Sequence, residues 1–484
     1  MLATLSSLRN LAVINYRFLK GNEMFKGFIR RRSVAGMGVL AATAMVLAGC
    51  ASEEGSDGDT ESNDSVSAEV VELNIATVNN PQMVDMESLK GEFESQYPEI
   101  KVNFIVMEEG DLRDSVTRDI STSGGQYDIL TIGAYEVPIW GANGWLADLT
   151  DLASADVDYD VEDILPPVRA GLSANDRLFA VPFYAESSFL MYNKEIFEAA
   201  GLTMPERPTW DEVAGLAKQI KDGGFADSGI CLRGKPGWGD QFAPLTTVVQ
   251  TFGGSWFDNE WNQTVNAPEF VEAVDFYTSL VRDYGQLDPV SSSFPECLTN
   301  VKNGTSAMWY DATSAAGSLE AADSPVSGKM GYVYAPVKET AQSGWLWSWN
   351  LAIPASSEKL DAAWTFVRWA TSKEYIQLVG NEIGWANLPP GSRVSTYEIP
   401  EYQEAAGAFA NITVEIMNDV NPGQPGVNPQ PWTGIQFVSI PEFPDIGNKL
   451  SQDLAPVFAG TASAQSVLDS AAAYVQAAGD AQKD

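Results

Sequence analysis

The alternation of strand-like and helix-like segments between residues 71 and 132 constrains the fold more than any other feature of this sequence. The expected segments are strand 71–77, helix 83–97, strand 101–107, helix 112–120 and strand 127–132. The strands are short apolar or alternating runs, and the helices repeat apolar residues every three to four positions. Strands that alternate with helices predict a parallel sheet covered on both faces. Ligands of such sheets bind beyond the carboxyl ends of the strands.

Residues 1–49 are typical of a secretory leader rather than of a folded body. Three arginines, 30–32, precede an apolar run at 34–47 that is too short to cross a bilayer as a mature helix. The run ends in Leu-Ala-Gly-Cys50, which resembles the lipobox of bacterial lipoproteins. Cys50 would then carry the lipid, and the polar segment 50–69 would be a flexible tether. A plain signal anchor is the alternative, and a start at Met24 would give a leader of the usual length.

The charge balance of the rest of the chain excludes several classes of partner. Without the seven basic residues and one acidic residue of 1–49, the chain has 22 Lys and Arg against 64 Asp and Glu, a formal charge of −42. Such a surface repels nucleic acid and anionic lipid heads. It suits a secreted protein in a saline habitat, or it reflects an acidic proteome in general.

The absence of histidine excludes His-based triads, His general acid–base catalysis and most zinc sites. Asp156, Asp158 and Asp160 begin like a calcium-binding EF-hand loop. Val161 and Pro167 then stand where the loop needs Gly and Glu. We therefore expect a solvated loop there, with no metal and no cofactor in the protein.

Cys231 and Cys297 are an even pair in a chain expected outside the cytoplasm. Such pairs form disulfides in oxidising compartments. A bridge here would stabilise the fold by roughly 3–4 kcal/mol. Two buried thiols are the alternative.

Several segments, in this order along the chain, together resemble the family-1 extracellular solute-binding proteins of ABC importers. They are the lipobox, 191–202 (MYNKEIFEAAGL), 208–212 (PTWDE), 304–309 (GTSAMW) and 351–355 (LAIPA). A narrower resemblance is to the branch that binds the polyols sorbitol and mannitol. It rests on 76–80 (ATVNN), 131–141 (TIGAYEVPIWG), 229–239 (GICLRGKPGWG), 384–391 (GWANLPPG) and 436–443 (QFVSIPEF).

The resemblance implies an α/β, two-lobed fold of the type II periplasmic-binding-protein kind. Each lobe would be a mostly parallel sheet flanked by helices, with the ligand cleft between the lobes. The expected lobes are 70–183 with 337–383, and 184–336 with 384–478. The resemblance also implies partners: a small polyol or sugar and the ABC permease subunits that receive it.

A polyol site needs carboxylates and amides for the hydroxyls, a cationic donor and aromatic walls. Such residues follow two expected strands and occur in the apolar crossover near Glu186, where an unpaired carboxylate is costly. The resemblance assigns ligand contacts to Glu186 and Asp311. Trp345, Trp347 and Trp349 share one face of an extended stretch, and we expect Trp347 to be a wall. The candidate ligand-binding residues are Asn79, Asn80, Tyr135, Glu136, Glu186, Arg233, Trp238, Asp311, Trp347, Asn350, Trp385 and Arg393, with Trp432 and Gln436 as later contributors.

Structural alternatives exist for most of these residues. Asn79 and Asn80 also suit a turn, and Arg233 also suits a structural ion pair. The Gly-rich loop that contains Arg233 and Lys235 is not a phosphate loop, because Pro236 replaces the required Ser or Thr.

Three functions remain open at this point. The first is capture of a polyol or related sugar by lobe closure, without chemistry, by a monomer. The second is a surface glycoside hydrolase or lyase, suggested by the many carboxylates and tryptophans. The third is a sensory sugar-binding lipoprotein. We expect the first, at the outer face of the cytoplasmic membrane. Ser52, close to Cys50, favours a Gram-positive cell, since in a two-membrane cell it would direct the lipoprotein to the outer membrane.

Overall fold

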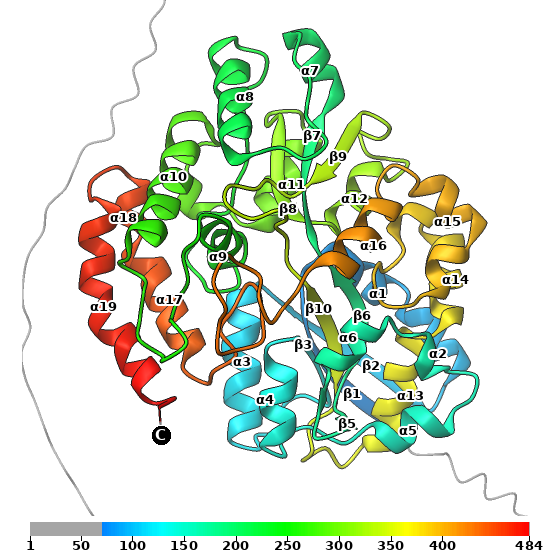
Figure 1. Ribbon diagram of the computed structural model, residues 1–484. Helices are drawn as coiled ribbons and strands as arrows, with labels where there is room; N and C mark the ends of the chain where they lie inside the picture. The colour runs from blue at the N-terminus through cyan, green and yellow to red at the C-terminus, as the bar shows by residue number, and fades with distance from the viewer. Residues whose placement is uncertain (1–69, 484) are drawn as a thin grey trace, which may run out of the picture. The chain divides into compact units, whose positions relative to one another are not determined.

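The computed structural model describes residues 70–483, which contain two larger β-sheets, a two-stranded hairpin and the helices packed around them (Figure 1). The predictions for Met24, Cys50 and the tether 50–69 lie outside the described residues. None of the helices within 70–483 is both long and apolar enough to cross a membrane.

The first sheet has five strands in the order β2-β1-β3-β10-β6. The bounds are β1 Val71–Val78, β2 Ile100–Met107, β3 Ile129–Gly133, β6 Val181–Glu186 and β10 Trp347–Ala352. The three predicted strands are present, and β1 pairs in parallel with both β2 and β3. β10 lies between β3 and β6 and is antiparallel to both. The carboxyl ends of β1, β2 and β3 therefore meet at one edge of the sheet.

The helices of the first half of the chain are α1 Pro81–Ser88, α2 Lys90–Gln96, α3 Glu109–Ser121, α4 Glu136–Ala142, α5 Thr150–Ala155 and α6 Pro166–Gly171, with a 3₁₀ turn at Val161–Asp163 and the hairpin strands β4 Ser173–Ala174 and β5 Arg177–Leu178. The expected helix at 83–97 is divided at Leu89 into α1 and α2. Buried Phe93 of α2 packs its ring on Phe366 and Trp369 of α13 (Leu360–Ala370), each about 5 Å away between ring centroids. These contacts join distant segments into one core.

The second sheet has three strands in the order β8-β7-β9, and both pairings are antiparallel. The strands are β7 Ser188–Asn193, β8 Met308–Ala312 and β9 Met330–Tyr334. The prediction of a mostly parallel sheet in each lobe is wrong for this sheet. Two parallel bridges, Ser228 to Ser306 and Cys231 to Trp309, add a short edge. Apolar runs predict strands but not their direction, and β7 follows β6 directly instead of after a crossover helix.

The remaining elements surround the second sheet or connect it to the first. They are α7 Lys194–Ala200, α8 Trp210–Asp222, α9 Phe242–Thr251, α10 Pro268–Tyr284, α11 Phe294–Lys302, α12 Ala315–Glu320, α14 Lys373–Glu382, α15 Pro400–Ala405, α16 Ala410–Asp419, α17 Phe443–Asp453, α18 Ala455–Phe458 and α19 Ala464–Asp480, with 3₁₀ turns at Pro289–Ser291, Trp385–Asn387 and Ser395–Glu398. A capping box at 209–212 opens α8, where the Glu212 backbone N–H donates to Thr209 Oγ1 at 3.2 Å.

The chain passes between the two sheets at two strand boundaries. One is Ser187, the single buried residue between β6 and β7, and the other lies between β9 and β10. Segment 384–391 then lies against β6: the Ala185 N–H donates to Pro390 O at 2.8 Å. Gly391 has φ +68°, and a Cβ there would meet Ala185 O at 2.2 Å, so only glycine is accommodated. The exact lobe boundaries remain a prediction.

Cys231 and Cys297 are joined in a disulfide whose Cα atoms lie 5.5 Å apart. The bridge closes a loop of 66 residues and connects the short edge of the second sheet to α11. Both cysteines are fully buried.

Candidate ligand-binding site

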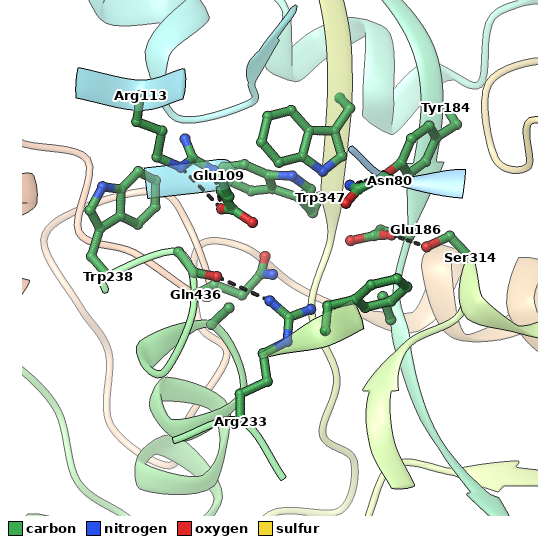
Figure 2. A pocket seen from close by; sticks show the side chains of 15 residues that line it. Asn80, Glu109, Arg113, Tyr184, Glu186, Arg233, Trp238, Ser314, Trp347 and Gln436 are labelled. Carbon is green, nitrogen blue, oxygen red and sulfur yellow. Dashed lines mark hydrogen bonds and ion pairs between the residues drawn. The ribbon is translucent and has the colours of Figure 1, made fainter. Parts of the chain in front are cut away.

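A cavity lies where the carboxyl edge of the first sheet faces the second sheet (Figure 2). The lining combines acidic, amide, cationic and aromatic side chains. It consists of Asn80, Glu109, Arg113, Tyr184, Glu186, Arg233, Trp238, Gly239, Ala243, Phe294, Ala312, Ser314, Trp347, Trp349 and Gln436.

One wall of the cavity carries Glu186, the last residue of β6. Its carboxylate accepts a hydrogen bond from Ser314 Oγ, and no ion pair within residues 70–483 involves it. Burial raises the pKa of Glu186 to about 8 from its ordinary value of 4.5. At neutral pH this group is therefore mainly a carboxylic acid, which both donates and accepts hydrogen bonds. Beside it, Asn80 Nδ2 donates to Tyr184 OH at 2.8 Å.

The opposite wall carries Arg233, held by the buried carboxylate of Asp311. Arg233 Nε donates to Asp311 Oδ2 at 2.8 Å, and Nη2 donates to Oδ1 at 2.5 Å. The third nitrogen, Nη1, donates to Gly239 O at 3.1 Å. The guanidinium lies 5.4 Å from the ring of Phe294, which also lines the cavity. This geometry fixes a planar cation beside an apolar surface.

A second cation, Arg113 of α3, closes one side of the cavity. Its guanidinium is bound by Glu109, with Nη2 to Oε1 at 2.8 Å, and by Glu136. It lies between three indole rings, at 4.1 Å from Trp238, 5.0 Å from Trp349 and 5.2 Å from Trp347. Trp238 belongs to the loop after Arg233, so this cation–π group joins the two sides of the cavity.

The segment 435–440 contributes the last polar group. Gln250 Nε2 donates to Ile435 O at 2.6 Å and so fixes the segment in place. Gln436 Oε1 is buried without a hydrogen-bond partner among the described residues. A buried amide oxygen without a partner is costly, and a ligand hydroxyl at this place would satisfy it.

Direct contacts between the two sides show that the cavity is in a closed arrangement. Tyr135 OH, at the end of β3, donates to Ile440 O at 2.7 Å. Lys235 Nζ lies 2.5 Å from Glu108 Oε2, at the end of β2. The Tyr135 ring also packs on Trp238, 5.1 Å away between centroids. These three contacts would be lost if the two sides of the cavity moved apart.

Five of the twelve candidate residues line the cavity: Asn80, Glu186, Arg233, Trp238 and Trp347, along with the later contributor Gln436. Three other candidates do not line the cavity but contact residues that do. Asp311 holds Arg233, Glu136 holds Arg113, and Tyr135 packs on Trp238.

The other four candidates lie elsewhere. Asn79 is exposed, and its backbone N–H donates to Met107 O. Asn350 is buried in the first sheet, where Nδ2 donates to Ile132 O at 3.1 Å. The Trp385 ring covers Gly380 of α14.

Arg393 binds Asp163 at 3.2 Å, beside the ring of Tyr159, and so forms a structural ion pair. Trp432, a later candidate, packs on Trp261 outside the cavity lining.

The sequence-based prediction missed Glu109, Arg113, Tyr184, Ser314, Trp349 and Phe294. A signal existed for Glu109 and Arg113, because β2 is parallel to β1 and its carboxyl end must reach the same edge as Asn80. The first turn of the helix after β2 therefore faces the cleft. The spacing of Glu109 and Arg113, four residues apart, is equally typical of a solvated helix face.

The family model for bacterial extracellular solute-binding proteins matches residues 80–377. This protein belongs to that family. A mannitol-binding protein of Pseudomonas aeruginosa is 43% identical over 402 residues, which cover 82% of this chain and 91% of that protein. An erythritol/L-threitol-binding protein of Mycolicibacterium smegmatis is 26% identical over 71% of this chain and 78% of that protein.

Solved structures show the same relationship. An ABC transporter solute-binding protein from Agrobacterium vitis S4 with bound D-mannitol is 45% identical and has a TM-score of 0.82, covering 86% of this chain and 99% of that chain. Another from Agrobacterium radiobacter K84, in complex with ribitol, is 26% identical with a TM-score of 0.74, covering 85% and 99%. The solute-binding protein described here therefore has the predicted two-lobed type II fold.

The site of this solute-binding protein is equipped to hold hydroxyl groups. It offers a guanidinium and amide groups as donors, a carboxylic acid as donor and acceptor, and indole rings for C–H edges. Residues 70–483 contain no cluster of three His, Cys, Asp or Glu residues placed to hold a metal ion.

The buried acid predicts a pH-dependent stability. Between about pH 4.5 and pH 8, folded Glu186 retains a proton that the unfolded chain releases, so its contribution to stability falls as the pH rises through this window. Glu186→Gln removes this dependence. Thermal unfolding without ligand should give equal melting temperatures at pH 4.5, and a variant melting about 2–4 °C higher at pH 8.5. Exposed Glu404→Gln is the control. A constant difference across the pH range would contradict the assignment.

Proposed function

We propose that this protein captures an acyclic polyol of hexitol size by closing its two lobes on it, and delivers it to an ABC permease. The observation that carries the proposal is the cavity itself, where Arg233 and Glu186 of the predicted lobe two meet Arg113 and Trp347 of the predicted lobe one (Figure 2). Each hydroxyl of a polyol is both donor and acceptor. A rigid guanidinium and a protonated carboxyl group therefore match different hydroxyls of one ligand.

The relatives support the same class of ligand. Two of the proteins compared above are a mannitol-binding and an erythritol/L-threitol-binding protein, and the two solved structures contain D-mannitol and ribitol, all acyclic polyols. They are binding proteins, which favours capture without chemistry over a glycoside hydrolase. The mannitol-related proteins are the more similar, at 43% and 45% identity, which favours a six-carbon ligand.

Closure would follow the predicted lobe division, with lobe one at 70–183 and 337–383 and lobe two at 184–336 and 384–478. The contacts of Tyr135 with Ile440 and of Lys235 with Glu108 would form on closing and break on opening. The permease would then recognise the closed form.

We further propose that a lipid on Cys50 holds the protein at the outer face of the cytoplasmic membrane of a Gram-positive cell.

Calorimetric titration tests the ligand class directly. We expect micromolar or tighter binding of D-mannitol or D-sorbitol, and weaker or no binding of xylitol, erythritol, glucose and maltose. Gln436→Ala should weaken hexitol binding about tenfold, because one buried hydrogen bond is lost. Gln219→Ala on the exposed face of α8 is the matched control and should bind like the unchanged protein. Tight binding of a cyclic sugar alone would overturn the polyol assignment.

A glycine in β3 tests the role of Trp347 as a wall. A Cβ at Gly133 would lie 2.0 Å from Trp347 Cζ2, so Gly133→Ala must displace the indole ring. Hexitol affinity should fall about tenfold, since the ring would no longer lie against the ligand's C–H edge. Gly110→Ala in α3 has no atom within 4 Å of the added Cβ and is the control. Unchanged affinity in Gly133→Ala would exclude Trp347 from the site.

A further inference from the structure

The disulfide lies directly behind two residues that line the cavity. Cys231 precedes Arg233 by two residues, and Cys297 follows Phe294 by three residues in α11. Arg233 and Phe294 are in contact with each other, with 5.4 Å between guanidinium and ring. The bridge thus connects the two chain segments that form one wall of the site, close to the point where each wall residue leaves its backbone.

Both segments are also attached to β8 without covalent bonds. The Cys231 backbone N–H donates to Met308 O at 2.8 Å, and side chains of both segments make further contacts. Arg233 binds Asp311 of β8, and the Phe294 ring packs on Trp309 of β8, with 5.2 Å between centroids. Trp309 Nε1 in turn donates to Asp311 Oδ2 at 3.0 Å. The separation of Arg233 from Phe294 therefore depends on how α11 is held beside the 231–233 segment.

Helix α11 is capped at its N-terminus by Ser293 and Glu296, and one buried face attaches it to the rest of the protein. It spans nine residues, from Phe294 to Lys302, too few to be stable alone in water. Of these residues, Phe294, Cys297 and Val301 are buried, and they occupy one face of the helix. Cys297 is the middle residue of that face, so its bond to Cys231 restrains both the distance and the rotation of the helix.

We propose that the Cys231–Cys297 disulfide is a positioning element of the ligand site, which holds the Arg233–Phe294 wall in the geometry that binds ligand. This proposal rests on the proposed function. A disulfide that only stabilised the fold would change the melting temperature and leave affinity unchanged at temperatures where the protein is fully folded. A positioning disulfide also changes the affinity, because a looser wall must be ordered when the ligand binds.

The test compares the purified protein with Cys231→Ala/Cys297→Ala and with Cys231→Val/Cys297→Ala, which refills part of the space. Hexitol affinity is measured by calorimetry at least 20 °C below each melting temperature. We expect both variants to bind about tenfold more weakly. Leu468→Ala, a fully buried position in α19, is the control for lost stability and should melt lower but bind as the unchanged protein does. Equal affinity in the cysteine variants would overturn the proposal.

Hydrogen exchange without ligand provides a second readout, which does not depend on the ligand assignment. The backbone N–H groups of Gly234 and Lys235 both donate to Ser292 O, two residues before α11. In the cysteine variants these amides and those of α11 should exchange faster, whereas those of α17 should not. Unchanged exchange around α11 would contradict the proposal.

Absence of hexitol binding by the unchanged protein would refute the proposed function instead, and hydrogen exchange would then decide the role of the disulfide. If neither variant folds, the same exchange is measured on the phosphine-reduced protein.

Discussion

The buried ion pair between Arg233 and Asp311 is the interaction on which the binding site depends. Both side chains are almost fully buried, and two parallel hydrogen bonds join them. Asp311 also accepts hydrogen bonds from Trp309 Nε1 and from the Ala312 backbone N–H. Both oxygens of the carboxylate are therefore hydrogen-bonded within the protein. Removing two charges from water is costly, and a hydrophobic pair would often be as stable. The pair is therefore better explained by placing a fixed cation at the cavity than by fold stability.

The cationic and acidic groups of the cavity are paired or protonated, and this arrangement suits a neutral ligand rich in hydroxyls. Arg233 stays charged, while burial keeps Glu186 largely protonated near neutral pH. Glu109 and Glu136 both bind Arg113, and its three indole neighbours join the two sides of the cavity. The unpartnered oxygen of Gln436 adds an acceptor. A charged ligand would leave one of these groups unpaired, whereas a polyol can satisfy all of them.

Much of the fold and part of the site could be predicted from the sequence, for identifiable reasons. Strand periodicity located β1, β2 and β3, and the strand-end rule placed Asn80 at the cavity. The unpaired carboxylate in an apolar stretch correctly singled out Glu186 as a cavity residue. The strand direction in the second sheet could not be predicted, because an apolar run looks the same in a parallel and in an antiparallel strand.

The wrongly predicted site residues share one physical origin. The type of a residue does not show whether its side chain binds a ligand or another residue of the protein. Arg233 and Arg393 are both buried arginines paired with aspartates, but only Arg233 reaches the cavity.

A crystal structure with D-mannitol tests the central claim most directly. We predict a hexitol between the lobes, with hydroxyls bonded to Arg233, Glu186 and Gln436. A ligand bound elsewhere, or one that contacts neither Arg233 nor Glu186, would contradict this account.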